Sequence, residues 1–343
     1  MHSRRVFFVV FIVTILISIS IILLANWAAS LGASILTNKG YWLESKVWKS
    51  QLLAKVEQPD IVIVGSSRVL NHIDTRQLEA ANINAFNYGI GGITLDDFSY
   101  SVEKASMVAK SAVLISIPAE RLFSTPECPR FWTFSDLKFY MKYAPSCISS
   151  MTSQNWLGLL PINAYFFPSS PPALHLPCKS LEGKKLVAEI QAEWRRDICS
   201  ESRLISWIRG NSSRWVIGYD NGDGEIISRE DSDWLDKERF IDLGKRPFNN
   251  SSLKFIGGLA DIVRRAGKTP ILLIEAAPVI HIGIEESLEN RVGIKTIYMN
   301  NIRFTSDEIA DADHVNRKGK EKVSRLLANI LACSPDENSS CPN

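Results

Sequence analysis

The stretch Asp60-Ile-Val-Ile-Val-Gly-Ser-Ser-Arg68 decides how the fold of this 343-residue chain is interpreted. Its four consecutive β-branched residues predict a buried strand of a parallel sheet, and Gly65 supplies the turn that ends the strand. Open α/β sheets bind ligands just beyond the carboxyl ends of their strands, so Ser67 would lie at the functional edge. Ser67 is therefore a candidate nucleophile. The alternative is that Ser66 or Ser67 only caps the following helix.

A second stretch, Asp311-Ala-Asp-His-Val-Asn-Arg-Lys-Gly-Lys320, precedes an amphipathic C-terminal segment. A catalytic serine needs a base to accept its proton and a carboxylate to orient that base. Asp311 and His314 lie on a predicted turn, close enough for a carboxylate to meet an imidazole. Asn316 is a plausible N-cap for the final helix and would hold this loop in place. His72 follows Ser67 in sequence but is interpreted as a surface or cap residue rather than as the base.

These stretches together resemble conserved blocks of the SGNH, or GDSL-like, hydrolase and acyltransferase superfamily. Gly65-Ser66-Ser67 stands where that family has Gly-Asp-Ser, and Asn87-Tyr-Gly-Ile-Gly-Gly-Ile-Thr94 is similar to its second block. Asp311 and His314 match the last block. The resemblance implies a catalytic triad of Ser67, His314 and Asp311. It covers roughly residues 58–122 and 253–331 and leaves the middle of the chain unexplained.

The resemblance also implies an oxyanion hole made by the backbone N–H groups of Ser67 and Gly92. The family's third block should fall at Pro118-Ala-Glu-Arg121, where neither its glycine nor its asparagine is present. Arg121 is therefore a candidate replacement donor, and Asn87 and Arg121 are candidates for substrate contact. The pattern is similar to the membrane-tethered branch, such as the alginate O-acetylation and teichoic-acid D-alanylation proteins.

The N-terminus begins with a basic cluster and continues with 20 uncharged residues from Val6 to Ala25. That length suffices for a helix that spans the hydrocarbon core of a bilayer. Arg4 and Arg5 favour a cytoplasmic N-terminus. We expect an uncleaved single-pass anchor in the inner (cytoplasmic) membrane, with the remaining chain periplasmic or otherwise extracytoplasmic. The alternative is a cleaved signal peptide, for which residues 28–33 are a loose match.

The composition narrows the remaining possibilities. The net charge is +2, from 39 basic and 37 acidic residues, which gives no electrostatic reason to expect nucleic acid as a partner. All six cysteines follow the apolar segment, which in an oxidising compartment suggests up to three disulfides, with Cys333–Cys341 as the simplest pair. The alternative is a reduced, buried set. The cysteines form no Cys-x-x-Cys pair, and Asp220–Glu225 lacks the alternation of a calcium loop, so we expect neither a metal nor a cofactor.

The pattern from Asp60 onward alternates strand and helix, which predicts an α/β fold with a parallel sheet. The resemblance specifies an SGNH-like (flavodoxin-like) three-layer sandwich. The predicted strands are Ile61–Val64, Asn84–Tyr88, Ala112–Ile117, Pro270–Ala276 and Ile294–Tyr298. The predicted helices are Leu43–Val56, Thr75–Ala81 with Asp74 as N-cap, Thr94–Ala109, Ser252–Arg265 and Arg317–Leu331.

The third and fourth strands are separated by a segment too long for a plain loop. It holds four of the six cysteines and six of the nine tryptophans, and Trp215–Ser228 within it predicts a β-hairpin. We expect a lid or acceptor-binding subdomain here. The predicted parts are 1–27 (cytoplasmic stub and transmembrane helix), 28–57 (linker and membrane-proximal helix), 58–122 and 251–332 (the two parts of the sheet domain), 123–250 (insertion) and 333–343 (tail).

The expected function is that of an acyltransferase or esterase acting on O-acyl groups of cell-envelope or exported polysaccharide. Ser67 would attack an ester or thioester carbonyl, and the acyl group would pass to a glycan hydroxyl or to water. The tethered relatives imply a multi-spanning membrane acyltransferase as a partner. The rival interpretation is a catalytically silent SGNH-like scaffold that binds polysaccharide or organises a membrane O-acylation complex. The missing third-block asparagine supports that rival, whereas the intact Asp311/His314 pair argues against it.

Overall fold

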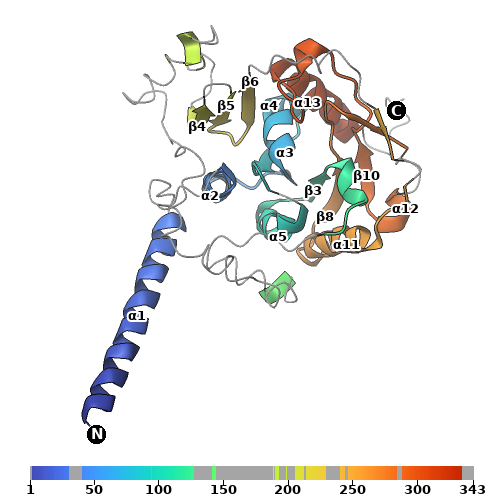
Figure 1. The fold of residues 1–343 in the computed structure, drawn as a ribbon. Coiled ribbons are helices and arrows are strands. Elements are labelled where there is room, and N and C mark those ends of the chain that lie inside the picture. Colours follow the sequence, from blue (N-terminus) through green and yellow to red (C-terminus); the bar gives the residue numbers. More distant parts are fainter. Residues whose placement is uncertain are drawn as a thin grey trace. The chain divides into compact units, whose positions relative to one another are not determined.

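The computed structural model describes residues 2–30, 41–93, 95–126, 141–143, 188, 190–192, 198, 205–211, 214–228, 240–243, 246–283 and 288–333 (Figure 1). The chain divides into two compact units. One contains residues 1–47 and 128–173, and the other contains residues 48–127 and 174–343. The sheets and the candidate site described below belong to the second unit.

The second unit is an α/β structure built on a parallel sheet of five strands. Those strands are β1 (Ile61–Gly65), β2 (Ala85–Gly89), β3 (Ala112–Ile117), β8 (Thr269–Ile274) and β10 (Lys295–Tyr298). They lie in the order β10-β8-β3-β1-β2, and each neighbouring pair is parallel. The order changes direction between β1 and β3, which is where open α/β sheets form their ligand crevice. The five predicted strands are therefore confirmed, with ends that shift by one or two residues.

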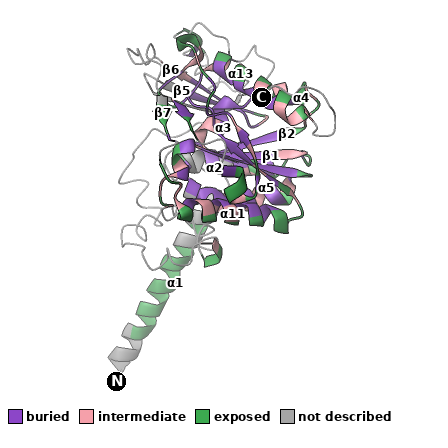
Figure 2. Cartoon of the chain, turned by 90° about the vertical axis from the view of Figure 1, so that its right-hand side faces the viewer, coloured by how far each residue is buried: buried purple, intermediate pink, exposed green. Residues whose placement is uncertain are grey.

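Helices cover both faces of this sheet (Figure 1). One face carries α3 (Ser67–His72), α4 (Thr75–Glu79) and α13 (Arg317–Ala332), whose apolar side chains share a core with Ile63, Leu114 and Leu273. The other face carries α5 (Phe98–Val108) and α11 (Asn250–Arg265), which pack on each other and on the sheet. Because both faces are covered, every residue of β3 is buried, and Figure 2 shows the strands buried between the helices.

The caps of these helices are largely those that the sequence predicts. The side chain of Asp74 accepts a hydrogen bond from the backbone of Arg76 at the start of α4, and Asn316 accepts two at the start of α13. The helix predicted from Thr94 begins later, because Leu95–Asp97 form a 3-10 turn, η2, before α5. The short helix α3 begins where the alternative interpretation of Ser66 and Ser67 expects a capped helix, for which no bounds were predicted.

The segment between β3 and β8 contributes three antiparallel strands, β4 (Ile205–Asn211), β5 (Arg214–Tyr219) and β6 (Gly224–Ser228). The predicted hairpin is β5–β6 and is confirmed. A further strand, β7 (Phe240–Asp242), pairs in parallel with β9 (Ile280–Ile282), and a short helix, α12 (Leu288–Val292), precedes β10. Of the six tryptophans in this segment, Trp207 lies in β4 and Trp215 in β5, whereas the other four lie outside the described residues.

The turn of the hairpin is anchored to the sheet domain. Asp223 Oδ2 accepts hydrogen bonds from the backbone N–H and the hydroxyl of Thr75, at 3.0 and 3.1 Å. Gly222 has a φ of 92°, and a Cβ there would lie 3.0 Å from the ring of Phe86, so this turn requires glycine. The acidic cluster considered above for calcium thus serves as a docking turn, with one carboxylate bound to α4.

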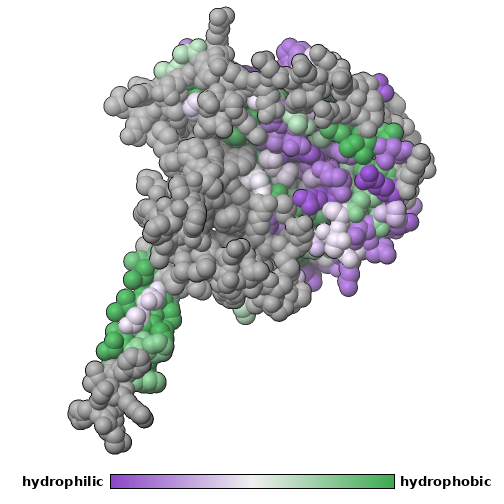
Figure 3. All heavy atoms as spheres, viewed as in Figure 1, coloured by the Kyte–Doolittle hydropathy of each residue, from purple (hydrophilic) through white to green (hydrophobic). Residues whose placement is uncertain are grey.

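The N-terminal helix α1 covers His2–Ser30, and α2 covers Tyr41–Leu53. Figure 3 shows a mainly hydrophobic surface on the described part of α1, where the hydroxyls of Thr14 and Ser18 donate to carbonyl oxygens one turn earlier. Within the described residues, no helix combines the length with the apolar character needed to cross a membrane. The anchor over Val6–Ala25 stays a prediction. The disulfides also stay predictions, because all the cysteines except Cys333 lie outside the described residues.

Candidate active site

The nucleophile candidate stands at the first position of α3, directly after β1. Ser66 is the N-cap, and its hydroxyl accepts a hydrogen bond from Arg68 N at 3.2 Å. Ser66 is therefore the residue that caps the helix, and Ser67 remains the candidate nucleophile. The backbone N–H of Ser67 belongs to the first turn of a helix, where such groups lack a partner within the helix. It is therefore suitable as an oxyanion donor.

The structure brings the three predicted triad residues together. Ser67 Oγ lies 2.9 Å from His314 Nε2, and His314 Nδ1 lies 2.7 Å from Asp311 Oδ1. A carboxylate only accepts hydrogen bonds, so Nδ1 carries the imidazole proton and Nε2 is free to accept the proton of Ser67. His314 is 6% exposed and Asp311 is 4% exposed, so the hydrogen bond between them is little screened by water. The geometry is that of an activated serine.

The loop that carries the base is a tight turn stabilised by its own backbone. Ala310 N donates to His314 O at 2.9 Å, and Ile309 forms an isolated antiparallel bridge with Val315. Asp313 N donates to Asp311 Oδ1 at 2.9 Å, which orients the carboxylate toward the imidazole. We call residues 311–315 the base loop. Its spacing of Asp-x-x-His works because the turn folds the carboxylate back onto the ring.

Asn87, a candidate for substrate contact, is fully buried behind the nucleophile helix. Its amide nitrogen lies 2.9 Å from the carbonyl oxygen of Val69 and 3.1 Å from that of Ile73, at the C-terminal end of α3. Its Oδ1 accepts from Gly89 N at 2.9 Å and from the buried amine of Lys49 at 3.3 Å. This position fits a residue that holds α3 in place, rather than one that contacts a substrate.

The two other predicted site residues lie at the same sheet edge. Ile90 N donates to Gly65 O at 3.0 Å, so the loop after β2 starts beside the end of β1. Gly92 follows in that loop, is exposed and has a φ of 76°, a conformation that favours glycine. Arg121 lies in the 3-10 turn η3 (Ala119–Leu122) after β3, where its N–H donates to Pro118 O.

Sequence reasoning missed the charged cluster next to the nucleophile. Three carboxylates surround the guanidinium of Arg68. The distances from its nitrogens to the nearest carboxylate oxygen are 3.2 Å for Asp313, 3.4 Å for Glu120 and 3.8 Å for Glu275. Although burial opposes it, these carboxylates raise the pKa of Arg68. The structure thus places Arg68 beside the triad. The signal that could have found it is its position, directly after Ser67.

Glu275 is the buried member of this cluster and follows the last residue of β8. Its Oε1 accepts a hydrogen bond from Ser116 at 3.2 Å and one from Ser66 at 3.4 Å. Burial raises the pKa of Glu275 to about 7, against the opposing effect of Arg68. A polar residue at the carboxyl end of a predicted strand is the same signal that selected Ser67. It applied equally to Glu275.

His72 is buried, so the expectation of a surface residue is wrong. It is the last residue of α3 and is 3% exposed, with its ring edge to face against that of His314 at 5.7 Å between centroids. Burial, with further contributions from His314 and Arg68, lowers the pKa of His72 well below its ordinary value. Its burial could not be inferred from the sequence, because neither the bounds of α3 nor the face that it buries was predicted.

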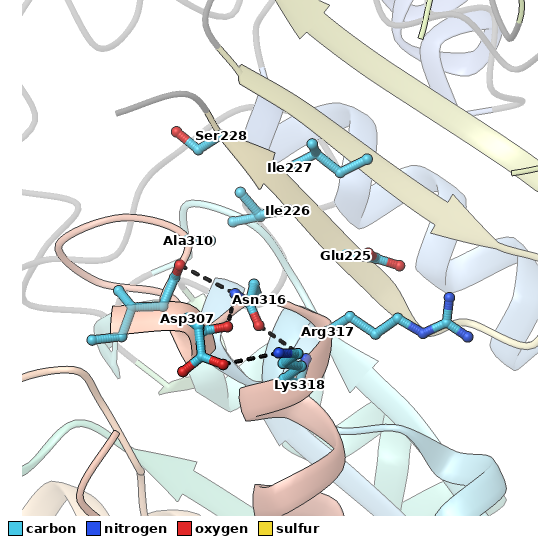
Figure 4. A pocket seen from close by; sticks show the side chains of 10 residues that line it. Glu225, Ile226, Ile227, Ser228, Asp307, Ala310, Asn316, Arg317 and Lys318 are labelled. Atoms are coloured by element: carbon cyan, nitrogen blue, oxygen red, sulfur yellow. Dashed lines mark hydrogen bonds and ion pairs between the residues drawn. The ribbon is translucent and has the colours of Figure 1, made fainter. Parts of the chain in front are cut away.

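A cavity of about 270 Å³ lies between the inserted sheet and the residues that flank the base loop. Its lining comes from β6 on one side and from Asp307, Ile309, Ala310 and residues 316–318 on the other (Figure 4). Lys318 Nζ and Asp307 Oδ2 form an ion pair of 2.8 Å at its edge, and Ile226 adds an apolar surface. The hairpin therefore forms one wall of a pocket next to the base loop.

Comparison with known proteins adds no assignment. No protein-family model matches the chain, and no curated protein and no solved structure is similar enough to count as a match.

Proposed function

We propose that this chain is a serine acyltransferase or esterase with an SGNH-like fold, acting on O-acyl groups of cell-envelope or exported polysaccharide. The observation that carries the proposal is the continuous chain of contacts from Ser67 Oγ to His314 and on to Asp311, at 2.9 and 2.7 Å. These three residues come from two segments that are more than 240 positions apart in sequence. The strand order and the position of Ser67 after β1 support the fold part of the proposal.

The reaction follows from the protonation states at the site. His314 Nε2 takes the proton of Ser67 as Oγ attacks the acyl carbonyl, and Asp311 stabilises the imidazolium that forms. The oxyanion is held by the N–H groups of Ser67 and Gly92. The leaving alcohol or thiol receives the proton from His314, and an acyl-serine remains. An incoming glycan hydroxyl or water then gives its proton to His314 and takes the acyl group, and His314 returns that proton to Ser67 Oγ as the acyl–oxygen bond breaks.

The cellular setting is part of the same proposal. The apolar helix α1 would anchor the chain in the cytoplasmic membrane, with the sheet domain extracytoplasmic. The acceptor would be a polysaccharide, with a multi-spanning membrane acyltransferase as donor-side partner. The inserted hairpin supports a role in acceptor binding, because it forms one wall of the cavity beside the base loop.

The proposal is tested by labelling the purified full chain with a fluorophosphonate probe. Wild-type protein should be labelled, whereas Ser67→Ala and His314→Ala should not, although both variants fold. Ser66→Ala is the matched control, because it removes the neighbouring hydroxyl and leaves the triad intact. Absence of labelling in folded wild-type protein would favour the catalytically silent scaffold instead.

A further inference from the structure

One buried imidazole next to the triad takes no part in the proposed reaction. His72 ends α3, the same six-residue helix that Ser67 begins. Its ring packs edge to face on His314, with 5.7 Å between the ring centroids. One short helix therefore presents the nucleophile at its first position and a second imidazole against the base at its last position.

The two ring nitrogens of His72 meet groups of opposite character. Nδ1 lies 3.1 Å from the carbonyl oxygen of Ala276, which can only accept, so Nδ1 must carry a proton. Nε2 lies 3.2 Å from the backbone nitrogen of Val315, which can only donate, so Nε2 must offer a lone pair. Both hydrogen bonds form only when His72 is neutral and protonated at Nδ1.

The hydrogen bond from Val315 reaches the base loop itself. Val315 follows His314 directly and pairs with Ile309 at the foot of the loop. Arg68, the second residue of α3, contacts Asp313 in the same loop. The loop is thus attached to the nucleophile helix at both ends of α3, and His72 supplies the buried attachment.

We propose that His72 is a positioning residue, which accepts the Val315 N–H and so holds His314 Nε2 within reach of Ser67 Oγ. This inference rests on the proposed function of Ser67 as the nucleophile. A neutral ring at this position is also required electrostatically, because His314 becomes an imidazolium during the reaction. The charged and titratable groups around His72 are His314 and Asp311 from the base loop and Arg68 from α3. A second positive charge among them would oppose proton transfer from Ser67.

Two substitutions separate the two ring nitrogens. In His72→Gln the side-chain oxygen can take the place of Nε2 and accept from Val315. In His72→Asn the shorter amide can replace only Nδ1 and leaves the buried Val315 N–H without a partner. We expect His72→Gln to be labelled by the fluorophosphonate within about fivefold of the wild-type rate, and His72→Asn about 10- to 100-fold more slowly. Equal rates in the two variants, each folded at the assay temperature, would overturn the proposal.

The protonation state is tested on the wild-type full chain without any need for an active serine. The chain has five histidines, so selective labelling with ¹⁵N-histidine gives few signals. His72 should show the shifts of a neutral ring protonated at Nδ1, unchanged between about pH 5 and pH 8. A ring that titrates near pH 6.5, or that is protonated at Nε2, would contradict the inference. If Ser67 did not react with the fluorophosphonate but His72 gave the expected signal, only the proposed function would be contradicted.

Discussion

Asp311 and Asp313 are close in sequence but have opposite environments. Asp311 is buried and accepts from His314 at 2.7 Å, whereas the side chain of Asp313 is 67% exposed and contacts Arg68. Asp311→Asn cannot hold the imidazole in its active tautomer, so we expect the rate of fluorophosphonate labelling to fall roughly thousandfold or more. Asp313→Asn loses one exposed ion pair and should reduce that rate by about fivefold at most.

Labelling rates of the two variants, measured side by side on the full chain, distinguish these roles. Both substitutions replace a carboxylate by an isosteric amide, so each serves as the control for the other. Equal losses would show that Asp311 is not the orienting carboxylate.

Glu275 makes a prediction about stability and pH. Its pKa is raised from 4.5 to about 7 in the folded protein, so the folded state binds the proton more tightly than the unfolded state does. Folding stability from this group is then greatest below pH 4.5 and is lost as the pH rises toward 7. Between pH 5 and pH 8 the titration of Glu275 should lower the free energy of unfolding of the wild-type protein by about 2–3 kcal/mol. Glu275→Gln removes this titration, so that part of the fall should be absent in the variant.

Denaturant unfolding curves across this pH range provide the measurement. Glu120→Gln is the control, because that carboxylate contacts the same guanidinium but its side chain is 44% exposed. A pH dependence that is identical in wild type and Glu275→Gln would show that Glu275 titrates in its usual range.

At the scale of elements, the close approach of β2 and α3 positions the nucleophile helix. A Cβ on Gly89 would lie 2.2 Å from the backbone nitrogen of Leu70, and backbone cannot move aside as a side chain can. Gly89→Ala should therefore destabilise the fold by about 1–3 kcal/mol or more and slow the labelling of Ser67. The displaced α3 would take Ser67 out of reach of His314.

The same substitution on another helix provides a matched control. Gly257 lies inside α11, and a Cβ there meets nothing within 4 Å. Gly257→Ala should raise the free energy of unfolding by about 0.5–1 kcal/mol, since alanine restricts the unfolded chain and favours the helix. If Gly89→Ala and Gly257→Ala shifted the unfolding midpoint in the same direction, the close approach of β2 and α3 would not explain the effect at Gly89.

The strands of the main sheet could be predicted because both of their faces are buried. Continuous β-branched runs such as Ile61–Val64 have few other interpretations. The helix α3 could not be predicted in the same way. It has only six residues, and its position depends on the side chain of Asn87, which bonds to carbonyl oxygens at its C-terminal end. Asn87 belongs to strand β2, so this contact leaves no pattern in the sequence of α3 itself.

At the scale of the whole molecule, the site joins parts that are distant in sequence. Motif spacing was enough to select Ser67, Asp311 and His314, since each belongs to a short local pattern. Arg68 and Glu275 each follow a predicted strand closely enough to be noticed singly, but no local motif joins Arg68, Glu120 and Glu275 into one cluster, because they come from three different strand ends. Only the strand order brings those ends together.

The buried amine of Lys49 links α2 to the centre of the sheet domain. It donates to the backbone carbonyls of Asn87 and Gly222, and burial lowers its pKa well below the usual value. Asn87 in turn holds α3, so α2 contributes to the support of the nucleophile helix. The triad and the residues of this network all belong to the second compact unit, which begins at Trp48.

Two truncations should therefore behave differently. Removal of residues 1–40 should release the protein from the membrane fraction of cells and leave the rate of fluorophosphonate labelling within about twofold of the full chain. Removal of residues 1–53 also deletes α2, with Lys49 and the buried Trp48 and Leu53. That protein should lose at least about 3 kcal/mol of folding stability.

Carbonate extraction of membranes and chemical unfolding measure these two effects separately. Retention of the 41–343 protein in the extracted membranes would show that residues 1–40 are not the only anchor. Equal stability of the two truncated proteins would show that α2 is dispensable to the sheet domain. The loss of labelling should instead follow the loss of α2, because Lys49 of that helix contacts Asn87, whose side chain in turn bonds to the backbone of α3.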